Sequence, residues 1–154
     1  MAGGPLAIAG PEVHDVAVVN LEGAAQVVEA AMDAFWLTDA RGSGRGWVVH
    51  LHATSLREWD GASYVAGGKA LPDGSMTLPG LSVTADATHS TVPSVVAGPY
   101  RLDGPPVKVA AAAAGTSMGR FSFTPTGALQ IAVPAHAYAR TYRSELSVTV
   151  TSGP

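Results

Sequence analysis

Apolar and polar residues alternate along several short stretches of this chain, with the period of two that half-buried β-strands show. In Trp47–Thr54, one face carries Trp47, Val49, Leu51 and Ala53, and the other carries Val48, His50, His52 and Thr54. A second strand-like stretch, Phe35–Thr38, precedes it, and a loop with three glycines separates the two. We predict a β-hairpin from these two strands, with Trp47 buried.

A longer alternation lies near the C-terminus, at Thr141–Thr151. Because the period of two is sustained over the whole segment, it predicts a single strand with one face on the core. The outward set is Thr141, Arg143, Glu145, Ser147, Thr149 and Thr151. The inward set is Tyr142, Ser144, Leu146, Val148 and Val150.

Shorter segments of β-forming residues recur between turns rich in Gly, Pro and Asp. Ala24–Met32 is ambiguous, because Ala and Glu favour helix whereas Val27 and Val28 favour strand, and we interpret it as a strand since its surroundings are β. The other predicted strands are Asp15–Leu21, Ser75–Leu78, Leu81–Ala85, Val95–Ala97, Val107–Ala111, Arg120–Thr124 and Ala128–Val133.

These segments predict an all-β fold, a two-sheet antiparallel β-sandwich of Greek-key, jelly-roll or Ig-like type. Residues 1–13 lack any period and are predicted to be an extended N-terminal arm, so that residues 14–154 form a single sandwich domain. Leu56–Gly74 is predicted to be an irregular surface loop, and 86–93 a polar loop.

Composition narrows the classes of function. The net charge is only −3 and the nine Lys and Arg residues are scattered, which argues against a nucleic-acid partner. No apolar run approaches the ~20 residues that span a bilayer, so membrane insertion is not expected. Cysteine is absent, which excludes disulfides and thiol chemistry. The N-terminal residues lack the basic segment of a signal peptide.

Candidate chemistry is sparse. His50 and His52 share one face of a strand, but no third ligand follows at a telling spacing, so we interpret them as surface histidines and expect neither metal nor cofactor. Asp39 in a calcium loop would need further oxygen ligands that the sequence does not identify. Gly42–Ser43–Gly44 lacks the context of a nucleophile elbow and is better explained as a turn. We expect no catalytic residues and no enzymatic activity.

Two aromatic residues, Trp59 and Tyr64, lie in the predicted irregular loop. Aromatic side chains in loops serve as anchors for sugars or proteins, and they also cover the ends of sandwiches. Both interpretations stay open. With His50 and His52 on the outer strand face, these residues are the candidate partner contacts.

Four ordered motifs give the chain a resemblance to the WxL domain family, over roughly residues 16–154. They are Asp39–Ala40–Arg41–Gly42 followed by Gly46–Trp47, then Leu71–Pro72–Asp73–Gly74–Ser75, then Ala97–Gly98–Pro99–Tyr100, and finally Tyr142–Val150. Trp47 matches the first family tryptophan, with Val49 in place of the leucine. In the second motif Val148–Thr149–Val150 stands where Trp-x-Leu is expected, so that tryptophan is missing.

The resemblance implies a non-catalytic β-sandwich at a cell surface, attached to peptidoglycan or another cell-wall glycan. An alternative is a structural subunit of a phage virion, of capsid-decoration or coat type, or of a filament, built on the same sandwich. There the N-terminal arm would contact neighbouring subunits, and the chain would be a homo-oligomer or lattice subunit. The localisation is then extracellular, at the cell surface or on a virion.

Overall fold

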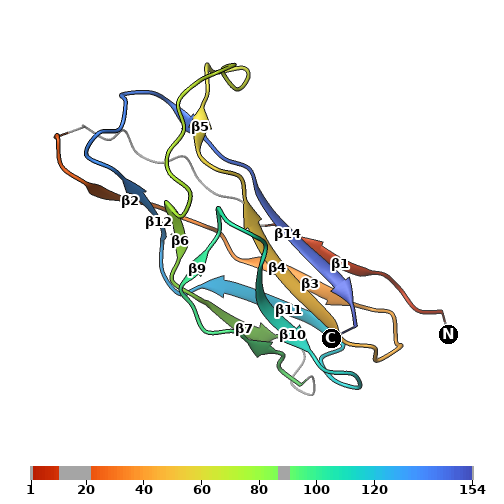
Figure 1. Cartoon of the computed structure of the whole chain (residues 1–154). Helices are drawn as coiled ribbons and strands as arrows, with labels where there is room; N and C mark the ends of the chain where they lie inside the picture. The colour runs from red at the N-terminus through yellow and green to blue at the C-terminus, as the bar shows by residue number, and fades with distance from the viewer. Residues whose placement is uncertain (1, 11–21, 87–90, 154) are drawn as a thin grey trace.

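The computed structural model describes residues 2–10, 22–86 and 91–153, and the described residues form antiparallel β-sheets without a helix (Figure 1). The strands are β1 (Leu6–Ala9), β2 (Gln26–Ala30), β3 (Phe35–Asp39), β4 (Trp47–Ala53), β5 (Arg57–Glu58), β6 (Met76–Leu78), β7 (Leu81–Ala85), β8 (Ser94–Val95), β9 (Tyr100–Arg101), β10 (Val107–Ala112), β11 (Gly119–Pro125), β12 (Leu129–Val133), β13 (Tyr142–Arg143) and β14 (Leu146–Ser152). The predicted all-β class is confirmed. The predicted strand Asp15–Leu21 lies outside the described residues.

The sheets form two layers. One layer contains the sheets β1-β3-β11-β7 and β2-β12-β6-β9. The chain runs directly from one of these sheets into the other at three places, from β2 into β3, from β6 into β7 and from β11 into β12. The other contains the sheet β14-β4-β10-β8, and the small sheet β13-β5 continues two of its strands. The arrangement is an elongated, sandwich-like molecule (Figure 1).

The core lies between these layers. Phe35 of β3 stacks on Phe123 of β11, with ring centroids 5.0 Å apart. Trp47 of β4, in the opposite layer, meets Phe121 at 5.9 Å and Phe123 at 6.2 Å. Trp47 is completely buried, as its alternation predicted, and Val49 on the same face is buried with it. Aromatic rings from both layers therefore interlock at the centre.

The predicted hairpin of Phe35–Thr38 with Trp47–Thr54 is wrong. β3 pairs with β1 and β11, whereas β4 pairs with β14 and β10, so the loop between them crosses from one layer to the other. The two strands turn their apolar faces toward each other across the core. They pack face to face and are not joined by backbone hydrogen bonds of one sheet.

The crossing loop is shaped by glycine. Gly42, Gly44 and Gly46 have φ of 68°, 63° and 77°, a region that side chains with a Cβ rarely adopt. The turn-forming role predicted for Gly42–Ser43–Gly44 is therefore confirmed, although the turn joins two layers and not two paired strands.

The predicted alternation of Thr141–Thr151 is confirmed, but the prediction that this segment is one continuous strand is wrong. Leu146, Val148 and Val150 are half-buried and their neighbours are exposed, while the chain divides into β13 and β14 at Ser144–Glu145. At this break the Thr54 hydroxyl accepts the Glu145 N–H at 2.9 Å, and the Ser144 hydroxyl donates to the Thr54 carbonyl. Side chains thus satisfy the backbone where the ladder changes partner.

Two further predictions need correction. The segment expected to be an extended arm contains β1, which pairs along its length with β3 and is an edge strand of the first layer. The segment 56–74, expected to be irregular, contains β5 and an isolated bridge between Trp59 and Tyr64. Both were missed because strands this short carry too few residues for a period to show.

Candidate functional site

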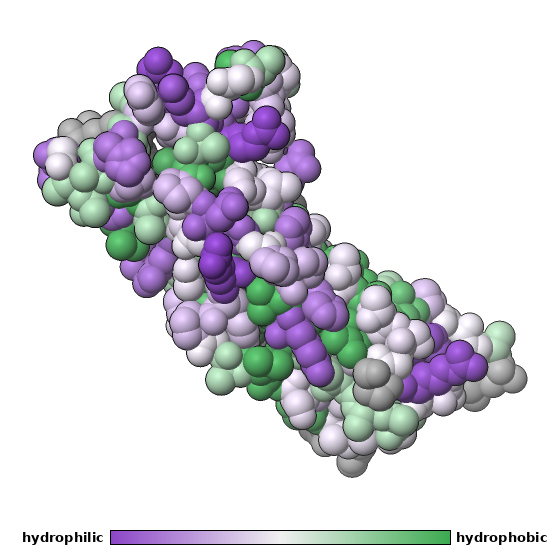
Figure 2. Space-filling model, viewed as in Figure 1, coloured by the Kyte–Doolittle hydropathy of each residue, from purple (hydrophilic) through white to green (hydrophobic). Residues whose placement is uncertain are grey.

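Aromatic and cationic side chains gather at one end of the molecule, in residues 57–70 and 138–143, which we call the end lobe. β5 pairs here with β13, which sets Arg57 opposite Arg143 and Glu58 opposite Tyr142. The lobe projects at the top of Figure 1, and Figure 2 shows strongly hydrophilic residues on the same end. Segments distant in sequence therefore build one surface.

Three rings of the lobe lie against a cation. The Arg143 guanidinium lies 4.3 Å from the ring centroid of Trp59, the Arg57 guanidinium 5.5 Å from that of Tyr64, and the Lys69 ammonium 4.4 Å from that of Tyr138. Trp59 and Tyr64 also meet edge to face, with centroids 5.1 Å apart. These are cation–π contacts, worth ~0.5–1 kcal/mol at exposed sites.

Hydrogen bonds and one ion pair hold the lobe together. The Asp60 carboxylate accepts the N–H groups of Ala62 and Ser63, at 2.8 and 2.7 Å, and these bonds lower the pKa of Asp60. The Glu58 carboxylate accepts the Lys69 N–H and pairs with Arg140 at 3.2 Å. The tip and the base of the lobe are thereby fixed to each other.

The lobe carries a local excess of positive charge. Four of the nine Lys and Arg residues of the chain are in it, namely Arg57, Lys69, Arg140 and Arg143, against two carboxylates, Glu58 and Asp60. The chain as a whole has a net charge of −3. The sequence suggested that the cations were scattered, and the pairing of β5 with β13 brings these four together.

The sequence-predicted contact residues fall on two different surfaces. Trp59 and Tyr64 meet in the end lobe and are half-buried, and the Tyr64 hydroxyl is buried without a hydrogen-bond partner in the described part of the chain. His50 and His52 lie on the outer face of β4, with Thr149 and Lys108 opposite His50 and Ser147 opposite His52. Sequence reasoning missed Tyr138, which is 54% exposed.

The core motif residues occupy structural positions. Trp47 donates its indole N–H to the Ser117 carbonyl at 3.1 Å, and Ser117, at φ 52°, donates its hydroxyl to Thr91. Tyr142 is half-buried at the base of the lobe, where burial raises the pKa of its hydroxyl. Leu146, Val148 and Val150 pack on the core from β14.

Asp39 does not have the free oxygen atoms that a calcium ligand needs. Its two carboxylate oxygens accept Nε–H and Nη2–H of Arg41, both at 2.9 Å, and this pairing lowers the pKa of Asp39. Arg41 also donates to the carbonyl of Gly46 and to the hydroxyl of Ser152. The motif Asp39–Arg41 therefore fastens the crossing loop to the end of β14.

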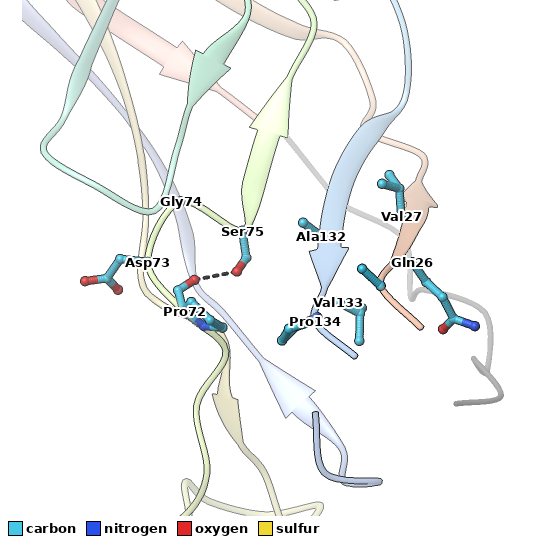
Figure 3. A pocket seen from close by; sticks show the side chains of 10 residues that line it. Gln26, Val27, Pro72, Asp73, Gly74, Ser75, Ala132, Val133 and Pro134 are labelled. Atoms are coloured by element: carbon cyan, nitrogen blue, oxygen red, sulfur yellow. Dashed lines mark hydrogen bonds between the residues drawn. The ribbon is translucent and has the colours of Figure 1, made fainter. Parts of the chain in front are cut away.

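A hollow of ≈ 360 Å³ lies beside β2 and β12 (Figure 3). Its walls are mainly apolar, from Val27, Ala132, Val133, Pro134 and Pro72. The Ser75 hydroxyl in its rim donates to the Pro72 carbonyl, and Asp73 points away from the hollow and accepts a hydrogen bond from Ser55. This hollow brings no nucleophile together with a base.

The described residues contain no group of three His, Asp or Glu side chains placed to hold a metal ion. The same part of the chain has no helix of the length and apolarity that crossing a bilayer requires.

No protein-family model, curated protein or solved structure matches this chain.

Proposed function

We propose that this chain is a non-catalytic surface module that binds a cell-wall glycan through the end lobe. The observation that carries the proposal is the gathering of Trp59, Tyr64 and Tyr138 with four cations on one projecting end. Aromatic rings pack on the apolar faces of sugars, and Arg and Lys bind carboxylates and phosphates. Wall polymers offer both, which fits the resemblance to WxL domains.

The half-buried state of Trp59 and Tyr64 supports a role for them as a fixed platform, with Tyr138 as the exposed contact ring. The cations lie over ring faces and stay hydrated on their other side, so an anionic group approaches them without breaking a buried pair. Lys69 and Arg143 are both exposed. Binding of this kind weakens with salt.

The test is a pull-down on purified peptidoglycan over a series of salt concentrations. We expect Tyr138→Ala and the double variant Lys69→Ala/Arg143→Ala each to reduce the bound fraction severalfold. Trp36→Ala and Arg120→Ala are matched controls, because these residues form a similar cation–π pair, at 5.6 Å, on the outer face of the sandwich. If the controls and the lobe variants bind alike, the lobe is not the binding site.

The second candidate is a structural subunit of a virion or filament, and the strand order favours it. The sheets β1-β3-β11-β7 and β2-β12-β6-β9 face the sheet β14-β4-β10-β8, and consecutive strands pass repeatedly between the layers. Sandwiches whose consecutive strands pass between the layers include the jelly rolls used in viral capsids and lectins. On this interpretation β1 and the residues around it make contacts between subunits.

Light scattering after size exclusion separates the two candidates. Particles much larger than a dimer that ignore peptidoglycan would support the assembly subunit and sink wall binding. Retention on peptidoglycan by a small species would support the wall module. Nearby capsid or tail genes would argue in the same direction as the large particles.

A further inference from the structure

Among the described residues, the strand β14 forms a long sheet edge. It is the longest edge strand of the described sheets, and β4 is the one strand that pairs with it there. Its sequence, Leu-Ser-Val-Thr-Val-Thr-Ser, contains no charged residue and no proline, and its register with β4 is continuous, without a bulge. Edge strands of soluble proteins usually carry a charged residue, a proline or a bulge, because these features prevent pairing with another chain.

The hydrogen-bond pattern identifies which backbone groups face outward. Thr54 donates to the carbonyl of Glu145 at 3.0 Å, and Gly153 donates to that of Gly46 at 3.1 Å. Because bonded pairs alternate along an antiparallel ladder, the odd-numbered residues of β14 bond to β4. The N–H and C=O groups of Leu146, Val148, Val150 and Ser152 therefore point away from β4.

The core is also incompletely covered along this side. Leu146, Val148 and Val150 are half-buried, whereas Val49 and Leu51 on the adjacent strand are fully buried. β1, the edge of the other layer, lies beside β14, and its Leu6 and Ile8 are likewise half-buried. A strand added here would cover apolar surface in both layers.

We propose that β14 pairs antiparallel with β14 of a second copy of this chain, about a two-fold axis at Thr149. In this register Val148 lies opposite Val150 of the second copy and Ser147 opposite its Thr151, so apolar residues meet apolar ones and no like charges face each other. The outward-facing groups of Val148 and Val150 form bonded pairs, and Thr149 forms the closely spaced non-bonded pair. This register uses the whole strand.

A second copy fits this edge better than an unrelated peptide because the strand is complementary to itself. The two-fold register keeps every inward residue on the inward face in both copies, since it pairs even-numbered residues with even-numbered ones. The result is one continuous sheet through both copies. The proposal does not depend on what the end lobe binds.

The test measures the mass of the full chain by light scattering at concentrations up to about 1 mM. We expect twice the 15.6 kDa of one chain for the wild type. Thr149→Lys and Thr149→Glu each place like charges opposite one another at the axis, so each alone should return to the mass of one chain. An equimolar mixture of the two should regain twice that mass.

Thr84→Lys is the matched control, because Thr84 is an exposed, outward-facing residue of another edge strand, β7. Circular dichroism would check that all variants fold, and Thr84→Lys should keep the double mass. A wild type that stays single at every concentration would overturn the proposal. So would a dimer that survives Thr149→Lys, and a mixture that fails to recover would overturn the two-fold register.

Discussion

Trp47 packs across the core between the two layers, since its ring contacts Phe121 and Phe123 of the opposite layer. Replacing Trp47 with Ala removes these contacts and the indole hydrogen bond to Ser117. We expect the free energy of unfolding, measured by urea denaturation, to fall by ~3–5 kcal/mol.

Trp36 is the matched control for this change, because it lies on the neighbouring layer but is 38% exposed. Trp36→Ala loses one cation–π contact with Arg120 and should change the free energy of unfolding by about 1 kcal/mol or less. If both substitutions have the same effect, the inward and outward faces have been assigned wrongly.

The ion pair of Asp39 with Arg41 gives stability a defined dependence on pH. The pairing with Arg41 lowers the pKa of Asp39 in the folded chain, whereas an unfolded Asp has a pKa of about 3.9. The stabilisation is therefore complete above about pH 4 and is lost as the pH falls through the lowered folded pKa. Arg41→Gln leaves a buried carboxylate without its partner and should cost about 3 kcal/mol at pH 7.

The measurement is the difference in unfolding free energy between wild type and Arg41→Gln, followed from pH 7 down to the acid range. This difference should shrink as the pH falls from about 4 through the lowered pKa of Asp39, because the unfolded chain is protonated at Asp39 first and the folded chain only at lower pH. Arg45→Gln, an exposed arginine in the same loop, should show neither the loss nor the pH dependence. A difference that is constant with pH would contradict the role given to Asp39.

At the scale of elements, most strands could be predicted from alternation, but their pairing could not. Glycines with positive φ suit a hairpin and a crossing loop equally well. The choice between them depends on β11, which pairs with β3, and on β14, which pairs with β4. Both partner strands lie far along the chain. Local turn chemistry therefore predicted the loop and misassigned what it connects.

Gly46 tests how closely the end of this loop approaches β10. A Cβ at Gly46 would collide with the backbone carbonyl of Ala112, in β10, whereas a Cβ at Gly42 would meet open space. Both residues have positive φ, so Gly42→Ala isolates the backbone strain, about 1–2 kcal/mol. Gly46→Ala adds the collision and should lower the free energy of unfolding by at least about 2 kcal/mol more.

Thermal or urea denaturation of the two alanine variants gives this comparison. Equal losses for Gly42→Ala and Gly46→Ala would mean that the loop does not pass close to β10. Unequal losses in the expected order would support the close approach of the loop's end to β10, the strand that pairs with β4 beside Gly46.

At the scale of the whole molecule, the sequence indicated the sandwich-like class but not the end lobe. Trp59 and Tyr64 were identifiable as loop aromatics, and their two interpretations stayed open. What joins them to Tyr138, Arg140 and Arg143 is the pairing of β5 with β13, two strands of two residues each. The alternation of Thr141–Thr151 covered β13, but β5 is too short for a period to show, and no local signal links two segments so far apart.

The end lobe and the β14 edge are directly connected along the chain, because β13 in the lobe leads through Ser144 and Glu145 into β14. In an antiparallel pair about Thr149, Leu146 of one copy faces Ser152 of the other. The lobes would therefore stand at opposite ends of the dimer. Two weak binding ends on one rigid body gain effective affinity only where a ligand repeats and spans both. A polymeric wall glycan has that property, whereas a single small sugar does not.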